Sequence, residues 1–339
     1  MNITFLVGNG FDLNLGLNTK YIDFYPYFIE NSSDGNIIKG MLIEDDLKWS
    51  DLESKLGENT YQINENNVDK FLDDKYEMDN LLLDYLEKEQ RKFVIVNPSK
   101  LKKEMSRSLT QYTNGLTTVE KESIKKTLSA YKHQEYMYRF ISFNYTNTLD
   151  SIVSLYSSDE QVISYHPNNN GNRTKEILGE VFHIHGTTNE YPIIAVNDET
   201  QIKNEDLRKN SRFTNVFIKP RINNLLGEKK IENAKSIINQ SHIICIFGMS
   251  LGVTDLMWWE ELVTWLKSNS DNKLIIYWKE DKKELKRMHP MVINIKDDIK
   301  KMFFNLGKAG RTEADYELIK NRIMIVFNTD IFSFVDANN

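Results

Sequence analysis

The chain has 339 residues, which is enough for about two domains or for one domain with a large insertion. Its single cysteine, Cys245, excludes a disulfide framework and a cysteine zinc site, and it favours a reducing, cytoplasmic compartment. The formal net charge of −6 argues against a dominant nucleic-acid surface. No apolar run approaches membrane-spanning length, and the opening run is too short for a secretory leader.

The chain opens with a short apolar run at residues 2–7 that is rich in β-branched side chains, which predicts a buried strand. Gly8 and Gly10 follow directly, and such glycines let the backbone turn tightly and approach a ligand. Thr19 is expected to cap a helix over residues 20–30. Strand, glycine turn and helix are typical of nucleotide sites in α/β proteins. The third glycine of the dinucleotide fingerprint is missing, so a simple tight turn is the alternative.

The next part of the chain favours helices. An aromatic stripe at helical spacing predicts a core-facing helix surface, and it consists of Tyr21, Phe24, Tyr25 and Phe28. Long charged segments then show helical periodicity at residues 42–56, 68–92 and 119–131, whereas residues 93–96 are a doubtful strand. We therefore predict a helical insertion or cap at 37–136 within a core formed by 1–36 and 137–339. Glu53, near Trp49 and Asp51, could reach a site, although solvation or helix capping is the alternative.

Strand-like runs return after this segment and alternate with helices. The predicted strands are 139–143, 161–165, 181–184, 193–196, 242–247, 273–278 and 323–327, and the predicted helices are 146–156, 228–240, 254–268 and 282–288. Such alternation predicts an α/β fold with a doubly wound, mostly parallel sheet and helices on both faces. Ligands in such folds bind beyond the carboxyl ends of the strands.

Two polar motifs follow predicted strand ends. Asn144 can donate and accept hydrogen bonds, so it could hold a sugar hydroxyl or a water, with helix capping as the alternative. Alternation places His183 and His185 on one strand face. A zinc pair lacks an obvious third ligand, whereas a neutral imidazole suits general base work. A structural role for either histidine is the alternative.

A third motif combines a strand, a glycine turn and a helix start near residue 250. Gly248 permits close approach of the backbone, and Ser250 could hold a phosphate. Asp255 could be a site carboxylate or a charge at the helix N-terminus. If the sheet is parallel, these strand ends converge with Gly8 and Gly10 at one edge.

These motifs resemble a known family. The opening stretch and the segment 142–149 (Ser-Phe-Asn-Tyr-Thr-Asn-Thr-Leu) resemble the bacteriophage abortive infection AbiH family, and so does the segment 49–53 (Trp-Ser-Asp-Leu-Glu). That family looks like a distant branch of the sirtuin-like NAD-binding proteins of antiphage defence. The resemblance implies a sirtuin-like, Rossmann-type core, while the absence of the zinc-binding cysteines of deacylating sirtuins argues against a protein deacetylase.

The resemblance also implies a site for NAD, as substrate or ligand. The residues that it assigns to binding are Gly8, Asn9, Gly10, Phe11, Asp12, Tyr145, Thr146, Gly186, Gly248, Met249, Ser250 and Asp255. The reaction would cleave the nicotinamide–ribose bond through an oxocarbenium-like transition state. Asn144 would position the ribose or water, and His185 would take a proton. Asp12 would stabilise charge on the ribose or cap the next helix. Hydrolysis would deplete NAD and stop growth of an infected cell.

The sequence is also compatible with two other functions. The chain could sense NAD, ADP-ribose or a signalling nucleotide without turnover and act through a partner, which Thr146 in place of a sirtuin aspartate favours. A metal-dependent nuclease or phosphoesterase would use Asp12, His183, His185 and Asp255 as ligands. Expected partners are a phage-derived trigger, a partner defence protein or a second copy of the chain.

Overall fold

The computed structural model describes the chain except for residues 50, 157–160, 169, 281–288, 307–310 and 339. Within the described residues, one sheet has seven strands in the order β3-β4-β2-β1-β5-β6-β7, and only β3 runs antiparallel to its neighbour. The strands are β1 (Asn2–Val7), β2 (Tyr136–Ser142), β3 (Val162–Pro167), β4 (Arg173–His183), β5 (Ile243–Phe247), β6 (Lys273–Trp278) and β7 (Ile323–Phe327). The predicted α/β fold with a mostly parallel sheet is therefore confirmed.

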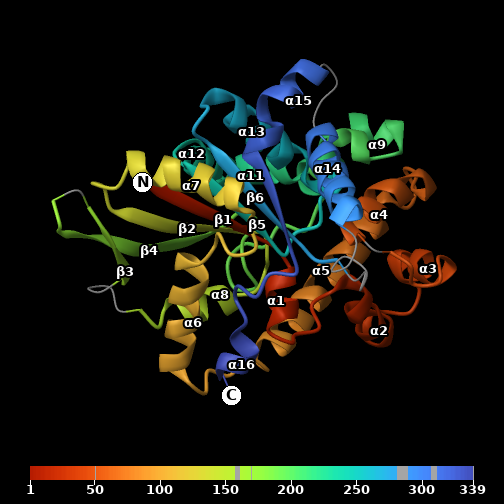
Figure 1. The fold of residues 1–339 in the computed structure, drawn as a ribbon. Helices are drawn as coiled ribbons and strands as arrows, with labels where there is room; N and C mark the ends of the chain where they lie inside the picture. Colours follow the sequence, from red (N-terminus) through yellow and green to blue (C-terminus); the bar gives the residue numbers. More distant parts are fainter. Residues whose placement is uncertain (50, 157–160, 169, 281–288, 307–310, 339) are drawn as a thin grey trace.

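Helices cover both faces of this sheet (Figure 1). One face packs against α6 (Pro98–Thr110), α7 (Thr118–Ala130), α8 (Thr148–Val153) and α16 (Phe334–Asn338). The other face packs against α12 (Lys230–Asn239), α13 (Leu256–Ser268), α14 (His289–Asn305) and α15 (Glu313–Ile319). In β1, Phe5 faces the first group and Leu6 the second. Because both faces are buried at the centre of the sheet and toward β7, the strands β5 and β7 are continuous apolar runs.

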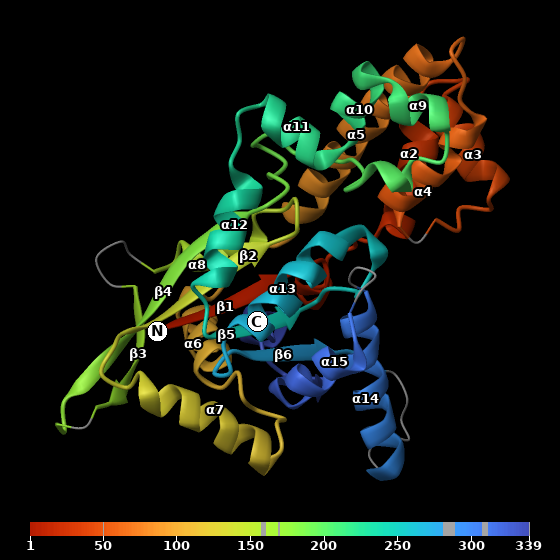
Figure 2. The ribbon, with the colours of Figure 1, turned by 90° about the horizontal axis from the view of Figure 1, so that it is seen from above.

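Six further helices form a helical lobe beside the carboxyl edge of the sheet (Figure 2). We define this lobe as α2 (Tyr21–Asn31), α3 (Ile37–Glu44), α4 (Leu52–Asn59), α5 (Val68–Gln90), α9 (Glu205–Lys209) and α10 (Ser211–Phe217). Trp49 is fully buried in the lobe, and its carbonyl accepts a 2.7 Å hydrogen bond from the Tyr25 hydroxyl. The lobe thus joins the region 20–90 with residues 194–218, while α6 and α7 pack on the sheet. The predicted boundary at 37–136 stays a prediction.

The local predictions hold best for long or strongly patterned elements. The strands at 2–7, 273–278 and 323–327 and the aromatic face of α2 are confirmed. The predicted strand at 181–184 is only the end of the longer β4, and residues 193–196 form one isolated bridge through Val196. Residues 93–96 are not a strand. The predicted helix at 282–288 lies outside the described residues.

Two helix predictions are wrong for identifiable reasons. The single helix expected at 42–56 is split into α3 and α4, because Asp46 and Leu47 adopt left-handed backbone conformations, which no helix interior tolerates. Thr19 does not cap α2, since the helix begins after Lys20 and the Thr19 hydroxyl donates to Asn9 instead. Within the described residues, no helix is both long and apolar enough to cross a lipid bilayer.

Candidate functional site at the carboxyl edge of the sheet

The topology places a crevice between β1 and β5. The connection from β1 to β2 includes α6 and α7, which pack on one face of the sheet. The connection from β5 to β6 contains α13, which packs on the opposite face. At such a switch point the two connections diverge and leave room for a ligand. Register keeps the strand ends level, because Val7 pairs with both Ser142 and Phe247, and Ser142 pairs with His183. The predicted convergence of these strand ends is therefore confirmed.

The glycines of the two turns pack against each other. The Gly8 amide donates to the Phe247 carbonyl at 3.0 Å, and the Gly10 amide donates to the Gly248 carbonyl at 2.7 Å. A Cβ on Gly10 would lie 2.4 Å from the Gly248 Cα, and Gly248 has a φ of +68°. These hydrogen bonds connect the turn after β1 to the turn after β5. Because the Gly8 and Gly10 amides are already used as donors, they are not free to bind a phosphate.

This contact predicts a strong response to one methyl group. Gly10→Ala should lower the free energy of unfolding by about 2–3 kcal/mol, because backbone atoms cannot move aside as a side chain can. Gly40→Ala is the control, since Gly40 lies in α3 with open space around it, and that change should stabilise by about 0.5–1 kcal/mol. Urea denaturation measures both, and equal shifts would contradict the packed-turn description.

Asp12 is buried beneath the first turn. Its carboxylate accepts hydrogen bonds from Thr146 Oγ1 at 2.6 Å and from Thr148 Oγ1 at 2.5 Å. Burial raises the pKa of Asp12, and the two hydroxyls and the nearby His183 oppose this rise. The contacts tie the segment after β1 to the segment after β2. Asp12 and Thr146 thus hold each other in place and do not line the cavity described next.

A cavity of about 450 Å³ lies at this edge between the sheet and the helical lobe. Its walls come from the strand-end loops, from the lobe and from the start of α11 (Lys219–Leu225). The lining residues are Asn9, Lys20, Tyr21, Ile22, Lys48, Asp51, Glu53, Phe143, Tyr145, His185, Lys219, Ser250, Thr254 and Asp255. A volume of this size is in the range of small-molecule sites, which run from about 300 to 1,000 Å³.

An ion pair is buried in the wall of this cavity. Lys219 Nζ lies 2.6 Å from Glu53 Oε2, and both side chains are less than a tenth exposed. The Tyr145 hydroxyl lies 2.9 Å from Glu53 Oε1 and 3.0 Å from the Ile193 carbonyl oxygen, so its one proton is shared between two acceptors. This arrangement joins α4, α11 and the loop after β2. Asp51 caps α4 by accepting from the Ser54 amide.

His185 is the imidazole that faces the cavity. Burial lowers the pKa of His185 well below its usual value, and the charges of Lys219 and Lys230 lower it further, so the ring is neutral at pH 7. The ring lies against Phe143, with centroids 5.7 Å apart, and near Tyr145 at 6.3 Å. A neutral, desolvated imidazole can accept a proton from a water or a hydroxyl.

Asp255 supplies a titratable carboxylate to the same cavity. Burial raises the pKa of Asp255 to about 7, and Glu53 and Asp51 raise it as well, whereas Lys219 opposes them. Asp255 immediately precedes α13, which begins at Leu256 and not at residue 254 as predicted. A carboxyl group with this pKa changes charge near neutral pH, which is unusual outside functional sites.

The other predicted histidine lies elsewhere. His183 Nε2 is 2.8 Å from Asp150 Oδ2, and its Nδ1 is 3.2 Å from the Asn144 carbonyl oxygen. β4 ends at His183, so the regular alternation does not extend to His185. Asn144 is buried beside these groups but does not line the cavity. Within the described residues, no three His, Cys, Asp or Glu side chains are arranged to hold a metal ion.

The structure thus divides the predicted site residues into two groups. Those that line the cavity are Asn9, Tyr145, His185, Ser250 and Asp255. Those that lie behind its walls or in the turns are Gly8, Gly10, Phe11, Asp12, Asn144, Thr146, Gly186, Gly248 and Met249. Gly186 has a φ of +75° and turns the chain tightly toward Glu190. Sequence reasoning assigned Tyr21 only to the core-facing aromatic stripe, and it missed Lys219 and Thr254, which no periodicity or motif marks.

One comparison with known proteins identifies a relationship. The family model described as "Bacteriophage abortive infection AbiH" matches residues 4–277, a range that contains every residue lining the cavity. No curated protein matches the chain.

Proposed function

Because the chain belongs to the bacteriophage abortive infection AbiH family, a role in antiphage defence follows, and we propose that it acts by hydrolysing NAD to nicotinamide and ADP-ribose. The proposal places the reaction in the cavity between β1 and β5. It includes a sirtuin-like core, which rests on the motif resemblance, and a cytoplasmic location, where cellular NAD is accessible. A phage-derived trigger would switch the reaction on.

The observation that carries this proposal is that His185 and Asp255 line the same nucleotide-sized cavity. A neutral imidazole can serve as a base, and a carboxylate can stabilise the positive charge of an oxocarbenium-like transition state. Lys20 and Lys48 are exposed lining residues whose positive charges could bind the phosphates of NAD. The carboxylates that line the cavity could stabilise the cationic nicotinamide ring. Phe143 offers that ring an aromatic surface.

The chemistry proceeds by displacement at the ribose. The bond between ribose C1′ and the nicotinamide nitrogen breaks, and its electron pair leaves with the neutral nicotinamide. A water oxygen bonds to C1′ while His185 takes the water proton, which is later released to solvent. The ionised Asp255 carboxylate stabilises the positive charge that develops on the ribose in the transition state.

The pH dependence of the reaction tests this assignment. NAD cleavage should rise about tenfold between pH 6 and pH 8, because Asp255, with a pKa of about 7, ionises over that interval. Burial lowers the pKa of His185 well below its usual value, so the change over this interval is assigned to Asp255. Asp255→Asn should lower the rate and flatten the profile. A profile of the same shape in this variant would contradict the role of Asp255.

A second candidate function is a nucleotide sensor without turnover. It is favoured by the finding that Asp12 and Asn144, two of the three predicted catalytic residues, do not line the cavity. Calorimetry with NAD and ADP-ribose, followed by an assay for nicotinamide in the same sample, separates the two functions. Tight binding with no nicotinamide release, even in the presence of an infected-cell extract, would select the sensor.

A further inference from the structure

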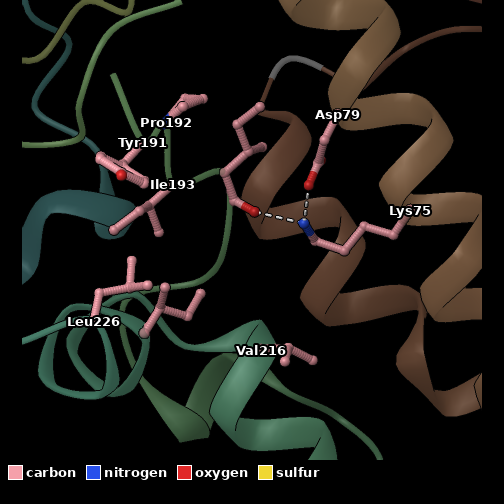
Figure 3. A pocket seen from close by; sticks show the side chains of 9 residues that line it. Lys75, Asp79, Tyr191, Pro192, Ile193, Val216 and Leu226 are labelled. Atoms are coloured by element: carbon pink, nitrogen blue, oxygen red, sulfur yellow. Dashed lines mark hydrogen bonds and ion pairs between the residues drawn. The ribbon is translucent and has the colours of Figure 1, made fainter. Parts of the chain in front are cut away.

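A second, smaller hollow of about 160 Å³ lies between α5, the segment 191–194 and the α10–α11 region (Figure 3). Most of its lining residues are apolar by type, while polar atoms form about half of its surface. The residues are Lys75, Asp79, Tyr191, Pro192, Ile193, Ile194, Val216, Ile222 and Leu226. The volume is suited to a single side chain or a small aromatic molecule and is too small for a dinucleotide.

The polar floor of this hollow carries an unused acceptor. Lys75 is buried, and its Nζ donates to Asp79 Oδ2 at 2.5 Å and to the Ile194 carbonyl at 2.6 Å (Figure 3). Asp79 Oδ1 is buried and has no hydrogen-bond partner among the described residues. A buried acceptor without a donor is costly, and such groups in native proteins call for an explanation.

The rim of the hollow is exposed and apolar. The side chains of Tyr191, Val216 and Leu226 are 70, 48 and 51% exposed, and the neighbouring Leu225 is 64% exposed. Tyr191 also has a φ of +41°, a strained conformation for a bulky residue. Contiguous apolar exposure of this kind marks interaction surfaces in soluble proteins.

We propose that this hollow binds a tryptophan side chain presented by a protein partner. The indole ring would pack against the apolar walls, and its single N–H would donate to Asp79 Oδ1. Indole is a donor without an acceptor, which matches the one unfilled position. Because Lys75 already balances the charge of Asp79, a neutral donor adds no net charge to the buried floor. Tryptophan is also among the residue types enriched at the energetically important centres of protein interfaces.

Binding in this hollow is coupled to the large cavity through one short segment. The Ile193 amide donates to the His185 carbonyl at 2.9 Å, and the Ile193 carbonyl accepts from the Tyr145 hydroxyl. The next carbonyl, of Ile194, accepts from Lys75 on the side of the hollow. His185 and Tyr145 line the large cavity. A partner that shifts the segment therefore shifts both cavity residues, and a cavity ligand affects the partner reciprocally.

Three small probes test the hollow without reference to NAD turnover. The full chain, labelled at isoleucine methyl groups, is titrated by NMR with indole, 1-methylindole and butylammonium. Indole should shift the methyl signals of Ile193, Ile194 and Ile222 in a saturable manner. The other two probes should bind about tenfold or more weakly, because 1-methylindole lacks the donor and butylammonium brings an uncompensated charge. Equal or tighter binding of either one, or no saturable shift with indole, would overturn the proposal.

Matched variants locate the effect. In Asp79→Asn the amide oxygen must face Lys75, so the NH₂ group points at the indole donor and the preference for indole over 1-methylindole should disappear. Asp73→Asn, on an exposed position of the same helix, should keep the preference. Leu226→Ser, at the exposed rim, should weaken both indoles alike and provides a test if Asp79→Asn fails to fold. Indole should also move the ring signals of His185, and unchanged ring signals at saturation would overturn the coupling.

Discussion

Replacing His185 with alanine is expected to lower the rate of NAD cleavage about 100-fold or more, the usual contribution of a general base. The reason is the position of the ring, which is neutral, desolvated and faces the cavity beside Tyr145. Nicotinamide release from purified protein, with and without an infected-cell extract, measures the rate. Circular dichroism verifies that the variant is folded.

The control for this prediction is His133→Ala. His133 is exposed and lies outside the cavity, between α7 and β2, so its replacement should leave the rate within a factor of about two. A His185→Ala enzyme as active as the His133→Ala enzyme would exclude His185 as the base. Loss of activity in both, with both proteins folded, would indicate that the reaction occurs at another place.

The largest effect on stability should come from the buried ion pair. Lys219→Met is expected to lower the free energy of unfolding by about 3–5 kcal/mol, because it leaves the Glu53 carboxylate buried without its cation. Urea denaturation measures the change. The double variant Glu53→Gln/Lys219→Met should recover part of the loss, since no buried charge remains.

An exposed ion pair in the same lobe provides the control. Lys55 pairs with Glu58 on the surface of α4, so Lys55→Met should change the free energy of unfolding by about 0.5 kcal/mol or less. Equal effects of Lys55→Met and Lys219→Met would show that Glu53 is solvated and that the lobe is not held by this pair.

The sequence predicts those elements whose burial is uniform. β1, β6 and β7 are mostly apolar runs between turn residues, and the long α5 repeats its apolar positions over many turns. The prediction of helix boundaries fails where the backbone angles of one or two residues end a helix. Asp46 and Leu47 are such residues, and they split one periodic segment into two helices. Aspartate adopts this conformation occasionally, so Asp46 gives only a weak signal, and local propensity gives no signal at all for Leu47.

The candidate site was likewise predictable only in part. The turn after β1 and the motifs after β2, β4 and β5 are visible in the sequence, and parallel topology then brings them together. The contacts of these residues could not be predicted, because they join positions far apart in the chain, such as Gly10 with Gly248 and Glu53 with Lys219. The sequence therefore indicated where a site would form, whereas the inward-facing groups became evident only from the packing of the lobe against the sheet.

The proposed reaction requires that the cavity between β1 and β5 holds NAD with its nicotinamide end beside His185 and Asp255. A crystal structure of the Asp255→Asn variant soaked with NAD shows whether it does, because slowed turnover should leave the intact dinucleotide in place. We expect nicotinamide packed near Phe143 and His185, with phosphates toward Lys20 and Lys48. NAD bound elsewhere, or this cavity empty at saturating NAD, would rule out the proposed reaction.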